Sequence, residues 1–355
     1  MRVALACLAS FFLICLAGCS GPSNHLPVHS GGSELPPGDP AYRTEVQVKY
    51  LGAGGVVIKR GDDVLLTAPF FSNPSILRVA FGEIAPRPDQ IDRFLGRPGN
   101  GLAGATAVLV GHAHYDHLMD VPYIKQKYLP QAKIYGSDTM KHTLAGDPAL
   151  RAVDVVSVEQ DAGTAERPGK WWPAGQRLRF MALKSEHAPI IAGLKFFEGA
   201  YDQPLTALPA RAYGWKEGQT LAYLIDFLGA DGETVEFRVH YQDAASNARY
   251  GFPPPLPHAE DKRRVDLAIV CMPGFDQVED YPEAIVKWLN PRHVVIVHWE
   301  NFFELLPDDR TGLRTVPTED AEGFLARLKA VLLPEGAEFK LPAPGAWMRF
   351  APPQQ

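Results

Sequence analysis

The chain has 355 residues, of which 46% are hydrophobic and 21% are charged, so a large core can be buried and a disordered chain is not expected. The formal net charge is −6. Since no basic field is available to attract phosphates, nucleic acid is not an expected partner.

The N-terminal segment is typical of a secretion signal. Met1 and Arg2 give a short positive start, and the apolar run from Val3 to Ala17 is too short to span a membrane comfortably. The run ends in Leu16-Ala17-Gly18-Cys19, which resembles the lipobox of bacterial lipoproteins. This resemblance implies that residues 1–18 are a lipoprotein signal peptide and that Cys19 is lipidated. An ordinary secretion signal with an incidental cysteine is the alternative.

Ser20 follows the cysteine, which in such lipoproteins favours the outer membrane, facing the periplasm, over the inner membrane. Two or more acyl chains give stable anchoring. Residues 19–41 are rich in Gly, Pro and Ser, and we expect them to form a flexible tether. A single folded domain is expected over residues 42–355.

Strands dominate the beginning of that domain. The turns Gly52-Ala53-Gly54-Gly55 and Gly61-Asp62-Asp63 separate apolar or alternating stretches, a pattern typical of β-hairpins. No helix follows the first turn, so it is not a nucleotide-binding glycine motif. The strands predicted in this part are 45–51, 56–60, 64–67 and 106–110.

Helices and strands alternate in the rest of the chain, which favours an α/β class. The predicted helices are 121–128, 138–144, 281–289 and 321–332. The predicted strands are 133–136, 153–158, 177–183, 221–228, 234–241, 264–272, 294–297 and a last one from 338. Two long segments, 69–102 and 188–219, are predicted to be irregular, and loops of this length are usually functional.

Four side chains that can bind a metal ion directly follow the predicted strand at 106–110. They lie in Gly111-His112-Ala113-His114-Tyr115-Asp116-His117. The C-terminal ends of strands are where α/β proteins usually bind ligands. Imidazole and carboxylate groups suit zinc and also admit iron or manganese. A solvated loop with incidental histidines is the alternative, and the close spacing around an aspartate makes it the weaker one.

Three further residues, His187, Asp243 and His298, share one feature with this cluster. Each comes at or just after the C-terminal end of a predicted strand. Strand ends that are far apart in sequence can converge on one edge of a sheet core. Taken singly, each histidine could be a surface residue and the aspartate a turn cap. Their order along the chain favours a shared metal site. His240, inside a predicted strand, is a candidate to support that site.

Taken together, these residues resemble the ligand pattern of the metallo-β-lactamase-fold hydrolases. That family carries His-x-His-x-Asp-His, then a His, an Asp and a C-terminal His, each behind a strand. The matching residues here are His112, His114, Asp116, His117, His187, Asp243 and His298. The resemblance extends from Tyr42 to Phe350. It implies an α/β fold of the four-layer αβ/βα sandwich type.

The same resemblance implies two divalent metal ions, with zinc expected and iron or manganese as alternatives. It assigns the first ion to His112, His114 and His187. It assigns the second ion to Asp116, His117 and His298, and it makes Asp243 a ligand of both. Such ions lower the pKa of a bridging water and supply hydroxide at neutral pH. Asp116 is the expected catalytic residue, because it can orient the hydroxide and take its proton.

One segment of the chain resembles a particular branch of this family. Val64-Leu65-Leu66-Thr67-Ala68-Pro69-Phe70-Phe71-Ser72 is similar to the strand and Thr-Asp-Pro-x-Phe-Ser segment of the branch with N-acyl-phosphatidylethanolamine phospholipase D and the ascorbate-phosphate lactonases. Ala68 stands where that branch has an aspartate, so a carboxylate near the metals is missing. The resemblance implies hydrolysis of a phosphodiester, ester or lactone bond in a small-molecule or lipid-like substrate.

The surroundings of the site leave alternatives open. Tyr115, Trp299 and Phe71 are candidates for a substrate pocket, although they could simply pack in the core. The apolar segments 70–81 and 190–215 could receive an amphipathic substrate or merely cover the sandwich. Two other classes of protein also fit the ligand pattern: a di-iron redox protein, and a metal-binding envelope lipoprotein without catalysis. The oligomeric state is not predicted.

Overall fold

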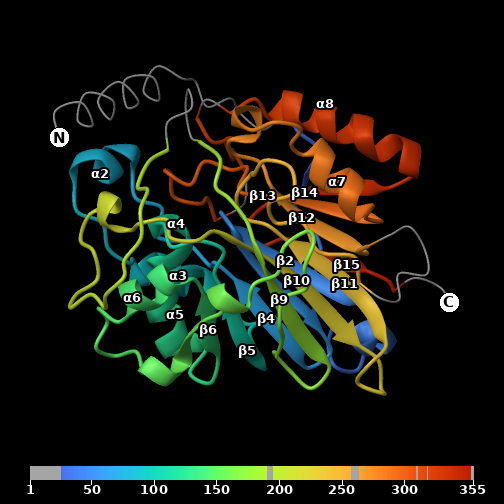
Figure 1. Ribbon diagram of the computed structural model, residues 1–355, viewed down its shortest axis with the longest axis horizontal. Helices are drawn as coiled ribbons and strands as arrows, with labels where there is room; N and C mark the ends of the chain where they lie inside the picture. The colour runs from blue at the N-terminus through green and yellow to red at the C-terminus, as the bar shows by residue number, and fades with distance from the viewer. Residues whose placement is uncertain (1–24, 190–194, 257–263, 309–310, 318, 353–355) are drawn as a thin grey trace.

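The computed structural model describes residues 25–189, 195–256, 264–308, 311–317 and 319–352. The expected signal peptide and Cys19 lie outside the described residues. In the described part, two β-sheets pack face to face and helices cover their outer sides (Figure 1). This is the α/β, four-layer αβ/βα sandwich expected from the sequence.

The first sheet has eight strands in the order β1-β14-β13-β12-β11-β10-β9-β8. Their bounds are β1 (Val28–His29), β8 (Trp171–Pro173), β9 (Leu178–Lys184), β10 (Leu221–Leu228), β11 (Val235–Tyr241), β12 (Leu267–Cys271), β13 (His293–Val297) and β14 (Glu338–Pro342). Strands β11, β12 and β13 are parallel, and β10 is antiparallel to both β9 and β11. Consequently β9, β11 and β13 all end at the same edge of the sheet.

The second sheet has seven strands in the order β15-β2-β3-β4-β5-β6-β7. Their bounds are β2 (Val46–Gly52), β3 (Gly55–Arg60), β4 (Asp63–Thr67), β5 (Ala105–Leu109), β6 (Lys133–Gly136), β7 (Val155–Ser157) and β15 (Trp347–Phe350). Side chains alternate along β5: Ala107 and Leu109 belong to the core between the sheets, whereas Val108 and Val110 belong to the core under the helices. Burial on both faces explains why this strand is apolar apart from Thr106, which is exposed.

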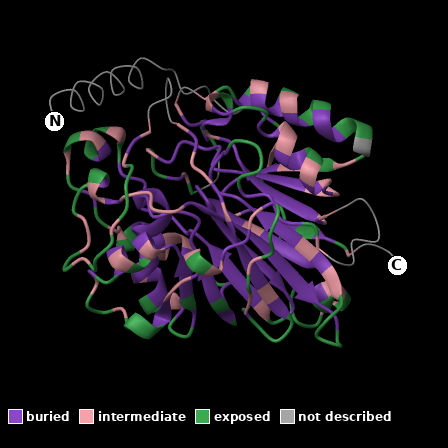
Figure 2. Cartoon of the chain, in the orientation of Figure 1, coloured by how far each residue is buried: buried purple, intermediate pink, exposed green. Residues whose placement is uncertain are grey.

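The helices lie on the outside of the sandwich (Figure 1). Those packed against the second sheet are α2 (Ile76–Phe81), α3 (Pro88–Leu95), α4 (Tyr115–Leu118), α5 (Val121–Tyr128) and α6 (Asp138–Leu144). Those beside the first sheet are α7 (Glu283–Leu289) and α8 (Ala321–Leu332). Figure 2 shows buried residues along the strands and exposed residues on the outer helices and loops. Among the described residues, no helix is both long enough and apolar enough to cross a membrane.

The prediction of a flexible tether is wrong for the described part of that segment, residues 25–41. Strand β1 in this segment pairs with β14, and Leu26 and Leu35 are buried. The backbone N–H of Leu35 donates to Gln47 Oε1 at 2.7 Å. The Gly- and Pro-rich composition therefore reflects irregular backbone that packs on the domain, and not a lack of contacts.

The segment 69–102 is also more ordered than predicted, because it contains α2 and α3. Pro88 stands in the first turn of α3, where a missing N–H costs little. The described part of 188–219 is irregular as predicted, apart from a single 3-10 turn, η5 (Ala212–Gly214).

Candidate metal centre

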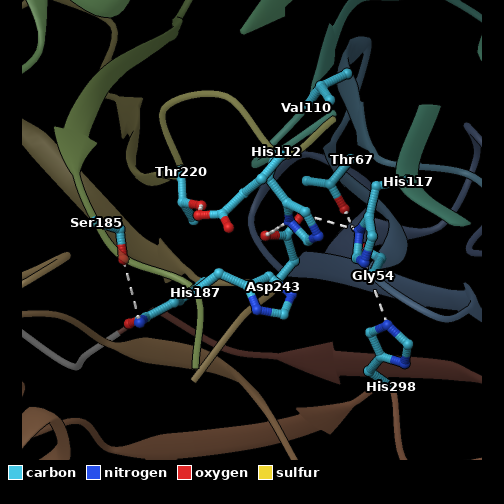
Figure 3. Close-up of polar contacts among 12 residues, drawn as sticks. Gly54, Thr67, Val110, His112, His117, Ser185, His187, Thr220, Asp243 and His298 are labelled. Atoms are coloured by element: carbon cyan, nitrogen blue, oxygen red, sulfur yellow. Dashed lines mark hydrogen bonds and ion pairs between the residues drawn. The ribbon is translucent and has the colours of Figure 1, made fainter. Parts of the chain in front are cut away.

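The seven predicted ligands come together at one edge of the sandwich. Figure 3 shows His112, His117, His187, Asp243 and His298 among them. The cluster from His112 to His117 follows β5 of the second sheet, while His187, Asp243 and His298 follow β9, β11 and β13 of the first. Within each of three groups, the ligand atoms lie within 4.8 Å of one another. The groups are His112, His114 and His187; His112, His117 and Asp243; and Asp116, His117 and His298.

The backbone just before His112 connects the two sheets at the metal centre. The carbonyl of Gly111 accepts a hydrogen bond of 2.7 Å from the N–H of Leu221 at the start of β10. A Cβ at position 111 would lie 2.2 Å from Asp243 Oδ1, so a glycine is needed for Asp243 to reach the centre. Helix α4 begins at Tyr115, so Asp116 and His117 lie in a helical turn and not in an open loop.

Asp243 lies between the two halves of the centre (Figure 3). Its Oδ1 is 3.2 Å from His112 Nδ1, and its Oδ2 is 3.1 Å from His117 Nδ1. Burial raises the pKa of this carboxyl, but His117 and His112 outweigh that effect and hold it well below its usual range. The carboxylate is therefore ionised, and its two oxygens face opposite halves, as a shared ligand requires.

The second half contains Asp116, His117 and His298. Asp116 Oδ2 is 3.2 Å from His298 Nε2 and 3.4 Å from His117 Nε2, and the two Nε2 atoms are 3.2 Å apart. Burial lowers the pKa of His117, but Asp116 and Asp243 outweigh it and raise that pKa to about 10. The space between the two carboxylates therefore favours a positive charge, which a divalent cation can supply.

The first half contains His112, His114 and His187. The Nε2 atoms of His112 and His114 are buried and have no hydrogen-bond partner among the described residues. Leaving such an atom unsatisfied costs about 1–3 kcal/mol. His187 Nδ1 donates to the carbonyl of Ala188 at 2.7 Å, which leaves the lone pair of Nε2 available.

The protonation state of this half also suits a metal ion. Burial lowers the pKa of His112 to about 3 and that of His114 well below its usual range. Both imidazoles are therefore neutral at pH 7, as ligation requires. The residues present thus fit two cations, one in each half.

Aromatic side chains surround the centre. Phe302 packs on His298 with ring centroids 4.7 Å apart, and Phe197 packs on His114 at 6.0 Å. Tyr115 is buried between Phe70 and Phe197, at 6.0 and 6.2 Å. Phe197 lies in the apolar segment 190–215 that was expected near the site, whereas Phe302 was not predicted, because no short motif marks a residue that packs on a ligand from another loop.

The other proposed pocket and support residues lie elsewhere. Trp299 is fully buried and its Nε1 donates to the carbonyl of Pro342 at 2.8 Å, so it packs in the core. Phe71 is buried and stacks on Phe94 at 5.5 Å. His240 is buried, and its Nε2 is hydrogen-bonded to the carbonyl of Gly251 at 2.7 Å. This hydrogen bond is not made to a metal ligand, so it gives no support to the site.

A cavity of about 1210 Å³ lies outside the ligand set, because none of the seven ligands lines it. Its walls are formed by the segment after β4, the segment before β10 and the segment after β13. Phe303 lines it and packs on Phe302 with centroids 4.4 Å apart, and Phe302 in turn contacts His298. Both apolar segments singled out in the sequence contribute to the walls, through residues 73–78 and 208–215.

No family model matches the chain. A stretch of 141 residues is 27% identical to cytidine monophosphate-N-acetylneuraminic acid hydroxylase of Asterias rubens, covering 39% of this chain and 19% of that protein. The chain therefore spans less than two thirds of the curated relative that it matches.

Several solved structures resemble the chain at low sequence identity. Igni18, a metallo hydrolase from Ignicoccus hospitalis, is 14% identical with a TM-score of 0.49, covering 86% of this chain and 99% of that one. The metallo-β-lactamase fold protein YhfI from Bacillus subtilis is 15% identical at 0.47, covering 86% and 100%. CmlA, a diiron β-hydroxylase from Streptomyces venezuelae, is 13% identical at 0.45, covering 88% and 55%.

Proposed function

We propose that this chain is a metal-dependent hydrolase that uses two divalent ions, with zinc as the expected metal. The observation that carries the proposal is the set of three interlocking groups of ligand atoms, each within 4.8 Å, at the shared edge of the two sheets. Solved structures that resemble the chain include a metallo hydrolase and a metallo-β-lactamase fold protein, which agrees with this reading.

The seven histidine and aspartate side chains divide into two sets, one for each ion. His112, His114 and His187 would hold the first, and Asp116, His117 and His298 the second, with Asp243 shared. Bound divalent ions lower the pKa of water toward neutrality and polarise a carbonyl or phosphoryl oxygen.

Asp116 is placed to accept the proton of the attacking water. Burial raises the pKa of its carboxyl, but His117 and His298 outweigh that effect and hold it well below its usual range. The carboxylate is therefore ionised at pH 7, as a residue that accepts a proton must be. Phe197 and Phe302, which pack on His114 and His298, limit the access of other water molecules from those sides.

The bond proposed to be cleaved is a phosphodiester, ester or lactone bond, in a small-molecule or lipid-like substrate. A substrate with an apolar part is supported by the cavity lined by Ile84, Trp215 and Leu305, which is linked to His298 through Phe303 and Phe302. Arg78 also lines it, so an anionic group on the substrate could be bound there.

The donor set also suits iron, because imidazole and carboxylate ligands are shared by zinc and di-iron sites. An oxidative function is therefore the second candidate. The identity of the bound metal decides between hydrolysis and oxygen chemistry, and a metal-loaded protein with neither activity would be a non-catalytic envelope protein.

We further propose that the protein is anchored in the bacterial envelope through lipidated Cys19, facing the periplasm. The sequence Leu16-Ala17-Gly18-Cys19 supports this, and these residues lie outside the described part of the chain.

A panel of substrates tests the proposed activity. The metal-loaded protein is assayed on a phosphodiester, a lactone, a carboxyl ester and a β-lactam, with Asp116→Asn beside the wild type. We expect hydrolysis of one of the first three and a loss of about 10²–10⁴-fold in the variant. Equal rates for the wild type and the variant would show that Asp116 does not act on the proton.

A further inference from the structure

The backbone of His298 has an unusual conformation. Strand β13 ends at Val297, and His298 turns away from it with a φ of +63°. A left-handed conformation is uncommon for a residue other than glycine and persists only where surrounding contacts hold it. The N–H of His298 donates to the hydroxyl oxygen of Tyr50 at 2.9 Å.

Tyr50 is itself fixed by a buried carboxylate. Its hydroxyl, which accepts the bond from His298, donates to Glu300 Oε2 in a short hydrogen bond. The other oxygen, Oε1, accepts a bond of 2.7 Å from the N–H of Ala53, another non-glycine residue with a positive φ, of +46°. Tyr50 and Glu300 are both fully buried, where a carboxylate is tolerated only if it is hydrogen-bonded.

This network connects the two sheets at one half of the centre. Tyr50 and Ala53 belong to β2 and its following turn, in the sheet whose strand β5 leads to Asp116 and His117. Glu300 and His298 follow β13 of the other sheet. The distance between His298 Nε2 and Asp116 Oδ2, 3.2 Å, therefore depends on how these segments are held together.

The first half does not depend on this network. His112 and His114 belong to the second sheet, and His187 is oriented through its own bond to Ala188. A loss of the Tyr50–Glu300 pair should therefore affect one half of the centre selectively.

We propose that Tyr50 and Glu300 are positioning residues that hold the backbone of His298 and so set the affinity for the second metal ion without contacting it. The proposal rests on the proposed metal centre. Groups that orient metal ligands typically change affinity by about 10–100-fold when they are removed.

Tyr50→Phe tests this proposal, because it removes one oxygen and keeps the ring. Tyr281→Phe is a matched control: Tyr281 is equally buried, and its hydroxyl donates to the carbonyl of Cys271 at 2.7 Å. Metal-free proteins are titrated with Co²⁺, and the visible absorption of each equivalent is followed together with the melting temperature.

We expect wild type and Tyr281→Phe to bind two equivalents. In Tyr50→Phe the first equivalent should bind as in wild type and the second about 10–100-fold more weakly. Glu300→Leu, which removes both acceptor oxygens and keeps similar volume, should show the same selective loss and serves if Tyr50→Phe does not fold.

The proposal is overturned if either folded variant binds the second equivalent as tightly as wild type, or if both equivalents weaken alike. Failure of the proposed metal centre is distinguishable, because the wild-type protein itself would then bind no Co²⁺.

Discussion

Gly54 lies directly against the imidazole of His117 (Figure 3). A Cβ at position 54 would fall 2.7 Å from His117 Nδ1 and 2.9 Å from the hydroxyl of Tyr241. The carbonyl of Gly54 accepts hydrogen bonds from Tyr241 at 2.6 Å and from Thr67 Oγ1 at 2.7 Å. The glycine-rich turn between β2 and β3 therefore forms one wall of the metal centre.

Gly54→Ala should displace His117 and weaken metal binding by about 10–100-fold. Gly38→Ala is the control, because a Cβ at position 38 meets nothing within 4 Å. The measurement is a titration of both metal-free variants with Zn²⁺ in competition with a chelating dye. Equal affinities for Gly54→Ala and Gly38→Ala would mean that the turn does not constrain His117.

Asp120 gives the protein a pH-dependent stability that Asp120→Asn should remove. Burial raises the pKa of this carboxyl to about 6, against the opposing hydrogen bonds from Ser72 and the N–H of Phe71. The folded state therefore holds the proton more tightly than the unfolded state, whose value is near 3.8. Stability falls as pH rises from about 4 to about 6, by about 3 kcal/mol for this group.

The measurement for Asp120 is urea unfolding at pH 4.5, 5.5 and 7. An amide cannot titrate, so the variant should gain stability relative to wild type as pH rises through this range. Parallel curves for the two proteins would show that Asp120 is not a buried carboxyl with a raised pKa.

Phe303→Ala should lower kcat/KM more for substrates with a long apolar part than for substrates with a short one. Because Phe303 lines the cavity and packs on Phe302, which contacts His298, we expect about a tenfold loss of kcat/KM on a long-chain ester, ~1.4 kcal/mol, and little change on an acetyl ester. Val153→Ala, at an exposed position that does not line the cavity, is the control. An equal loss on both esters would indicate a general disturbance of the site.

Cys19→Ser should release the protein from the membrane fraction when it is expressed in a bacterium that lipidates such proteins. The acyl chains supply the affinity, so their loss should leave the protein in the soluble periplasmic fraction. Cys271→Ser changes a buried cysteine of β12 and should not alter the fractionation. A membrane-bound Cys19→Ser protein would rule out lipidation at this residue.

The sequence was sufficient to predict the fold class and to name the residues that meet at the edge. His187, Asp243 and His298 could be picked out because each follows an apolar strand, and parallel strands end at one edge. Trp299 was misplaced because adjacency to His298 in the chain does not put a side chain on the same side of the backbone.

The supporting residues could not be predicted in this way. Tyr50 and Glu300 are 250 residues apart in sequence, and their hydrogen bond depends on the packing of two sheets. The contact between Gly54 and His117 is likewise a matter of backbone approach, which leaves no pattern in the sequence. The packing of residues 25–41 was missed because composition does not reveal a strand pairing as short as that of β1 and β14.

The most direct test of the account is the metal content of the purified protein, measured by elemental analysis together with hydrolysis before and after chelation. We predict two zinc equivalents per chain, loss of hydrolysis on chelation and its return when zinc is added. Hydrolysis by a protein that holds no metal, or two irons with consumption of oxygen and no hydrolysis, would contradict it.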